Sequence, residues 1–141
     1  MVEKNILKLE RLQERALRFV YNDKVSSYEE LLTKGDFLSL SMYRIYFLAI
    51  EVFKCFKGLN PEYLNELFEK KHISYNLRNS DLIVQQKFDT KTHGYKSFSY
   101  FGAKVWNTLP QDLKNSESIS SFKIALKSWC KGSTARLLNN F

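Results

Sequence analysis

The segment from residue 39 to residue 57 is the most hydrophobic of the chain, and it constrains the fold more than any other feature. Apolar side chains occupy nearly every side of a helix drawn through it, and only Arg44, Glu51 and Lys54 form a narrow polar stripe. A helix that is apolar almost all round lies at the centre of its domain or docks against a larger partner. The segment therefore predicts either a core helix or a docking helix.

Helical spacing and capping signals predict helices on both sides of this segment. Residues 3–21 predict an amphipathic helix, because apolar residues recur there at steps of three and four. Ser27 and Glu30 match a capping box and predict a short helix that ends near Gly35. The apolar residues of the first helix are Leu9, Leu12, Ala16 and Phe19.

Two more helices are expected in the later part of the chain. Asn60 as N-cap and Pro61 as first helical residue predict a helix over residues 61–70. Ser118 as N-cap predicts a last helix over about residues 119–129, with Phe122 on its inner face.

The stretch between these helices changes character. Leu82, Val84 and Phe88 alternate with polar residues, which is typical of a strand. Residues 95–101 are rich in aromatic side chains, which also favour a strand. These two segments predict a small antiparallel hairpin over residues 82–101, followed by a short helix over residues 102–108.

The fold class expected is therefore mainly α, with about five helices and this one hairpin. A length of 141 residues fits a single domain. We expect that domain over residues 1–130, with a flexible tail over residues 131–141. Within it, the expected parts are a helical region over 1–70, the hairpin and short helix over 72–110, and the C-terminal helix over 118–130.

The sequence offers little for bond chemistry. Cys55, Cys130, His72 and His93 show no metal-ligand spacing, so neither a metal nor another cofactor is expected. The sequence contains no Gly-x-Ser-x-Gly elbow, phosphate-binding glycine loop or adjacent pair of aspartates. We therefore expect a protein that is not an enzyme.

The same features bear on compartment and membrane. Two cysteines make no disulfide framework and the first residues form no apolar leader, so an intracellular location, cytoplasm or nucleus, is expected. The longest apolar run, residues 45–50, is far shorter than the ~20 residues of a membrane span, so no membrane contact is expected. No sequence feature sets an oligomeric state.

Basic residues concentrate in the second half of a chain whose formal net charge is +7. Residues 70–104 carry seven basic and two acidic side chains, a net of +5, whereas residues 25–69 carry four and seven, a net of −3. Basic surface attracts polyanions through counterion release. The charge therefore predicts nonspecific contact with RNA or DNA, although the same charge also serves solubility.

The candidate binding residues fall into a cationic and an aromatic set. A basic stripe runs along the first helix and comprises Lys4, Lys8, Arg11, Arg15 and Arg18. This stripe is either a phosphate-tracking face or a solvated surface with ion pairs. The hairpin aromatics are either core or a base-stacking platform. The candidate phosphate contacts are Lys8, Arg11, Arg15, Arg18, Arg78, Lys87, Lys91, Lys96 and Lys104. The candidate stacking residues are Tyr95, Phe98 and Tyr100.

Four blocks in order make the chain resemble the C-terminal region of non-LTR (LINE-type) retrotransposon reverse transcriptases. They are LERLQERALRFVYND (9–23), SYEELL (27–32), EVFKCFKGLNPEYLNELF (51–68) and KSFSYFGAKVWNTLP (96–110). The chain departs from the family pattern where Tyr43 and Arg44 stand in place of paired arginines, and no proline precedes the last block.

The resemblance implies a non-catalytic accessory region of a larger RNA-directed DNA polymerase, in a truncated or decayed copy. The Tyr-x-Asp-Asp box of that polymerase is missing here, so no catalytic residue carries over. The implied partners are template RNA or target DNA and the missing polymerase domain. The alternative is a structural or protein-interaction module that docks on that polymerase through the apolar helix over residues 39–57.

Overall fold

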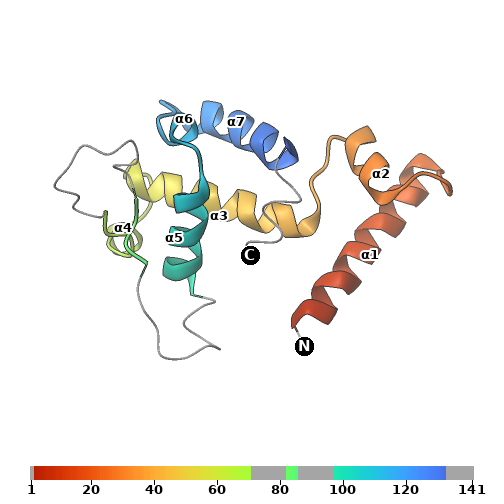
Figure 1. Cartoon of the computed structure of the whole chain (residues 1–141), viewed down its shortest axis with the longest axis horizontal. Helices are drawn as coiled ribbons and strands as arrows, with labels where there is room; N and C mark the ends of the chain where they lie inside the picture. The colour runs from red at the N-terminus through yellow and green to blue at the C-terminus, as the bar shows by residue number, and fades with distance from the viewer. Residues whose placement is uncertain (1, 71–81, 86–96, 133–141) are drawn as a thin grey trace. The chain divides into compact units, whose positions relative to one another are not determined.

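The computed structural model (Figure 1) describes residues 2–70, 82–85 and 97–132, with side chains from residue 5 onward. These ranges hold seven α-helices and one isolated antiparallel bridge, so the prediction of a mainly helical chain is confirmed. Two of the helices, α4 (Glu62–Asn65) and α6 (Gln111–Lys114), are single turns, and α6 lies where the sequence predicts no helix.

The chain divides into two compact units. Unit 1 comprises residues 1–45 and 129–141, and unit 2 comprises residues 46–128. The single domain expected over residues 1–130 stays a prediction. The expected tail lies outside the described residues except for Lys131 and Gly132, which belong to the last turn of α7 (Ile119–Gly132).

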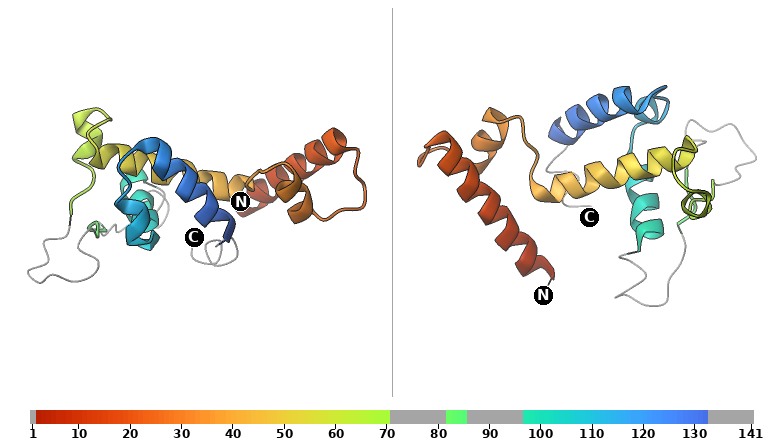
Figure 2. Two further views of the ribbon diagram at one scale, coloured as in Figure 1. Left: turned by 90° about the horizontal axis from the view of Figure 1, so that it is seen from above. Right: turned by 180° about the vertical axis from the view of Figure 1, so that it is seen from behind.

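Unit 1 is built on α1 (Val2–Tyr21) and α2 (Tyr28–Lys34), which lie side by side (Figures 1 and 2). The left-handed backbone of Asn22, with φ of 48°, ends α1. The predicted capping box is confirmed, because Ser27 Oγ accepts the Glu30 amide and the Glu30 carboxylate accepts the Ser27 amide. Asn22 and the capping box therefore mark, in the sequence, the end of α1 and the start of α2.

Unit 2 is organised around its part of α3 (Leu40–Phe56), the helix that the hydrophobic segment predicts. Val52 and Phe53 are fully buried, and the Phe53 ring stacks on Phe122 of α7 with ring centroids 4.2 Å apart. Most apolar side chains of α3 are thus buried by packing within the chain. Phe47 is the exception, with 59% of its surface exposed.

The aromatic block, which is the last of the four sequence blocks (residues 96–110), contains α5 (Phe98–Thr108), which crosses α3 within unit 2 (Figures 1 and 2). At the crossing, a Cβ added to Gly102 would lie 2.9 Å from the Phe68 ring and 3.0 Å from Val52. Glycine therefore permits the two helices to approach this closely. One turn later Trp106 packs on Phe56 of α3, with ring centroids 4.9 Å apart.

The predicted hairpin over residues 82–101 is wrong in the described residues. The proposed second strand is helical from Phe98 onward, because Ser97 caps α5 by accepting the Tyr100 amide. Aromatic content favours strands only weakly, and the helical spacing of Phe98, Gly102 and Val105 prevails over it. Residues 86–96, which include the predicted turn, lie outside the described residues.

The segment over residues 82–85 pairs with other partners instead of with a second strand. Ile83 forms the antiparallel bridge to Lys70, and the Val84 amide donates to the Glu69 carbonyl over 2.9 Å. The Asn107 side chain of α5 accepts from the Ile83 amide and donates to its carbonyl, over 2.9 and 3.0 Å. One side-chain amide thus supplies the two hydrogen bonds that a neighbouring strand would have supplied.

The capping signals of the later helices have different outcomes. Ser118 caps α7 as predicted, accepting the Ser121 amide over 3.1 Å. The helix expected over residues 61–70 is only the single turn of α4, and Pro61 is its N-cap residue. The Asn60 amide nitrogen donates to the Glu51 carbonyl over 3.2 Å, and α4, which begins after Pro61, has no side-chain cap.

We expect Gly102→Ala to lower the free energy of unfolding. Overpacking against buried Phe68 and Val52 costs about 1–3 kcal/mol, and this exceeds the helix-propensity gain of about 1 kcal/mol. Denaturant unfolding of both proteins measures the difference. Gly132→Ala is the control, because nothing lies within 4 Å of the added Cβ. An unchanged or higher stability of Gly102→Ala would contradict the close helix approach.

Candidate nucleic-acid interface

The surface of α1 is the part of the described chain that gathers most of the predicted cationic residues. One side of this helix packs within unit 1 through Gln13 and Leu17, of which Leu17 is buried. Gln13 donates to the Leu38 carbonyl over 3.0 Å. The packed side fixes which of the remaining side chains face solvent.

Glu10 is the centre of the packed side. Its carboxylate accepts the Leu40 and Ser41 amides over 3.2 and 2.8 Å, and the Ser41 hydroxyl over 2.8 Å. These amides open α3 and have no partner within that helix. The Tyr28 hydroxyl of α2 lies 2.5 Å from the same carboxylate and 2.7 Å from Gln13 Oε1. One side chain of α1 therefore holds both α2 and the N-terminus of α3.

These contacts set the ionisation of the group. Partial burial raises the pKa of Glu10, but the hydrogen bonds from Tyr28, Ser41 and Leu40 lower it more, so the pKa lies below its ordinary value. Burial, together with the hydrogen bond to Glu10, raises the pKa of the Tyr28 hydroxyl. Near neutral pH the pair is therefore a carboxylate that accepts and a phenol that donates.

The cationic stripe of α1 follows from this orientation. Lys8, Arg11 and Arg15 are exposed and form no ion pair with any described residue. Arg18, the fourth predicted cation of α1, is bound to Glu14 through an Nη2 to Oε1 distance of 2.7 Å. Of the four predicted cations of α1, three are therefore available for a ligand, and Arg18 is already paired with Glu14.

An apolar stripe lies next to these cations and is exposed as well. Leu9 is 44% exposed, Leu12 57% and Phe19 89%, whereas such residues ordinarily face the core of a globular protein. Along the helix the cations and these apolar residues occupy adjoining arcs of solvent-facing surface. Sequence reasoning did not identify this, because no hydrophobicity pattern indicates that Glu10 and Gln13 lie on the packed side.

Three predicted residues, Phe98, Tyr100 and Lys104, lie on α5, in unit 2. Phe98 is half-buried, and its ring makes an edge contact with Phe68 at a centroid distance of 5.3 Å. Tyr100 and Lys104 are half-buried and one helical turn apart. The other predicted residues lie outside the described residues: Arg78, Lys87, Lys91, Tyr95 and Lys96.

Neither a metal-binding cluster nor an exposed thiol occurs among the described residues. No cluster of three or more histidine, cysteine, aspartate or glutamate side chains that could hold a metal occurs in the described ranges. Cys55 and Cys130 are both buried, and burial raises the pKa of Cys130 to about 12, which suppresses its thiolate.

None of the helices in the described ranges has the length and apolarity needed to cross a bilayer.

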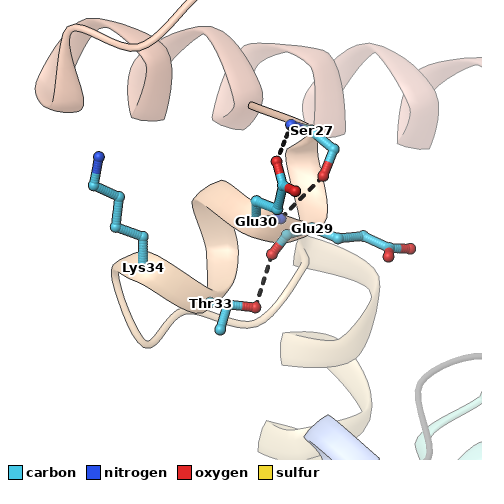
Figure 3. A pocket seen from close by; sticks show the side chains of 5 residues that line it. All are labelled: Ser27, Glu29, Glu30, Thr33 and Lys34. Atoms are coloured by element: carbon cyan, nitrogen blue, oxygen red, sulfur yellow. Dashed lines mark hydrogen bonds between the residues drawn. The ribbon is translucent and has the colours of Figure 1, made fainter. Parts of the chain in front are cut away.

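A shallow hollow beside α2 is lined by polar side chains (Figure 3). Ser27 and Glu30 are engaged with each other's backbone amides, and the Thr33 hydroxyl donates to the Glu29 carbonyl over 2.9 Å. Lys34 lies 3.7 Å from Asp23. These groups maintain the ends of a short helix, and they place no nucleophile beside a base.

Comparison with protein-family models, with curated proteins and with solved structures finds no match to this chain. The resemblance to retrotransposon reverse transcriptases therefore stays a prediction from the four sequence blocks.

We expect Glu10→Gln to destabilise the protein by about 1–3 kcal/mol near neutral pH. In the wild type, four hydrogen-bond donors converge on the two carboxylate oxygens of Glu10. Glutamine offers only one acceptor oxygen to them. Because the folded pKa of Glu10 is below the ordinary 4.5, its stabilisation is present above that pH and is lost as the pH falls. Denaturant unfolding at a series of pH values should show the two proteins converging at acid pH.

The control is Glu29→Gln, which changes an exposed carboxylate of α2. A difference between wild type and Glu10→Gln that stays constant down to about pH 3 would contradict the assignment of the carboxylate as acceptor.

Proposed function

We propose that this chain binds nucleic-acid phosphates without sequence preference through the cationic stripe of α1, defined as Lys8, Arg11 and Arg15. The observation that carries the proposal is that all three are exposed and unpaired among the described residues. A solvated helix surface held together by ion pairs would instead show carboxylates beside each cation, as Glu14 lies beside Arg18.

The spacing of the stripe suits a phosphate backbone. Lys8 and Arg15 are seven residues apart, so they span about 10 Å along the helix axis. A strand of duplex DNA presents about three phosphates over that length. Three cations on one side of α1 therefore match a short run of one strand, and they offer no fixed donor pattern for reading base edges.

Unit 2 supports a second, smaller contact in the same proposal. Lys104 would hold a phosphate and Tyr100 would stack on a base, since the two are one turn apart on α5. Arg18 contributes only after leaving Glu14, and Phe98 only after leaving Phe68. Lys87, Lys91, Lys96, Arg78 and Tyr95 belong to the proposal on charge and composition alone.

In this proposal the chain is an accessory region of a longer retrotransposon-type reverse transcriptase. The support is the set of four sequence blocks and the net charge of +7. Docking on a polymerase through α3 is the weaker alternative, because the described side chains of α3 are largely buried and Phe47 is its main exposed apolar residue. Among the described residues, the largest group of exposed apolar side chains lies on α1 instead.

The triple variant K8Q/R11Q/R15Q is expected to weaken binding to both single-stranded RNA and duplex DNA. Losing three phosphate contacts lowers the slope of log affinity against log salt by about 2–3 units. Fluorescence anisotropy with labelled oligonucleotides over a salt series measures both quantities.

The control variant K24Q/R44Q/K123Q removes the same charge from exposed residues outside the stripe. Equal losses in the two variants would mean that only net charge matters. An absence of binding by the wild type at low salt would refute the proposal altogether.

A further inference from the structure

The exposed apolar stripe of α1 has the spacing of a coiled-coil seam. Leu9, Leu12, Ala16 and Phe19 are separated by three, four and three residues, which are the a and d positions of successive heptads. All four are exposed, and Phe19 is 89% exposed. A strict a and d stripe is narrower than the face that a helix presents to a globular core.

The charges that flank this seam are of one sign. In the same heptad register Lys8 and Arg15 occupy g positions, whereas Gln13 and Val20 occupy e positions. Both g cations are exposed and unpaired among the described residues. The g and e positions select the partner of a coiled coil through charge complementarity.

A second copy of this chain is a poor occupant. Two antiparallel copies would place the basic g residues Lys8 and Arg15 opposite one another. Two parallel copies would pair them with Gln13 and Val20, which carry no charge. Neither arrangement offers these cations an opposite charge.

A lipid surface suits the seam less well than a helix does. Helices that lie in a membrane interface bury a broad apolar face that is flanked by cations. Here cations border the seam on one side only, and the other border carries no charge: Gln13 donates to the Leu38 carbonyl of unit 1, and Val20 is 70% exposed. A single partner helix needs only the narrow exposed strip.

We propose that the exposed seam of α1 docks an acidic amphipathic helix of a partner protein. Apolar residues of that helix at a and d would pack on Leu12 and Phe19, and its flanking glutamates or aspartates would pair with Lys8 and Arg15. The inference goes beyond nucleic-acid contact and does not depend on it, because phosphates make no use of the apolar seam.

The size of the seam sets the expected affinity. Leu9 to Phe19 spans about three helical turns, or about 15 Å. A contact of that length, with two charge pairs at its rim, is expected to give a dissociation constant on the order of micromolar. The complex should weaken at high salt, because its charge pairs are exposed to solvent.

The test uses a labelled synthetic peptide of about three heptads with leucine at a and d and glutamate at e and g. Fluorescence anisotropy should show that it binds the full chain, and that L12Q/F19Q weakens binding by about tenfold or more. The same variant should keep its nucleic-acid affinity and its unfolding midpoint, because both side chains are exposed. V25Q/I124Q is the control, since it removes exposed apolar residues elsewhere.

Several results would overturn the proposal. One is equal binding of a peptide with lysine in place of glutamate, and another is an acidic peptide that does not bind or binds L12Q/F19Q as well as wild type. Binding to phosphatidylserine vesicles that is lost in L12Q/F19Q, without peptide binding, would assign the seam to a lipid surface. Sedimentation that shows a wild-type dimer and a monomeric L12Q/F19Q would assign it to a second copy.

Discussion

The Glu10 carboxylate determines how unit 1 is built, because three elements meet at its two oxygens. It receives the amides that open α3, the Ser41 hydroxyl and the Tyr28 hydroxyl of α2. An anion at a helix N-terminus also interacts favourably with the helix dipole. Placing this polar group inward turns the apolar stripe of α1 outward. The exposed surface that carries both proposals is thus a consequence of one polar contact.

In unit 2, the side chains of the aromatic block are used mainly for packing. Trp106 packs on Phe56, and Phe122 stacks on Phe53, so the rings of α5 and α7 are used to cover α3. Gly102 allows the close crossing that brings these rings together. The aromatic block contains no acid, histidine or cysteine and is therefore suited to packing. Contacts with ligands are then left mainly to other surfaces.

Sequence reasoning located helices where local signals are strong. The Ser27 and Ser118 caps and the apolar run of α3 are readable, because each depends on neighbouring residues alone. It failed at residues 98–101 because aromatic content was given more weight than helical spacing and the Ser97 cap. It also failed at Asn60, because α4 begins after Pro61 and has no side-chain cap, while the Asn60 amide nitrogen donates to the Glu51 carbonyl.

The candidate site was predictable only in part for the same reason. The cations Lys8, Arg11 and Arg15 are visible as a stripe in the sequence, because helical spacing alone places them on one side. Which side of α1 is buried depends on Leu40 and Ser41, some thirty residues away. A hydrophobicity pattern carries no information on such a contact and favours burying Leu12 and Phe19.

The two proposed ligands of α1 compete for its cations but not for its apolar residues. Phosphates and an acidic helix both require Lys8 and Arg15, so one surface cannot hold both at once. Charge alone cannot distinguish these ligands, whereas burial of Leu12 and Phe19 can, because nucleic-acid phosphates present no apolar surface to them. Under the two proposals, the exposed seam would therefore favour a helical protein partner over a nucleic acid.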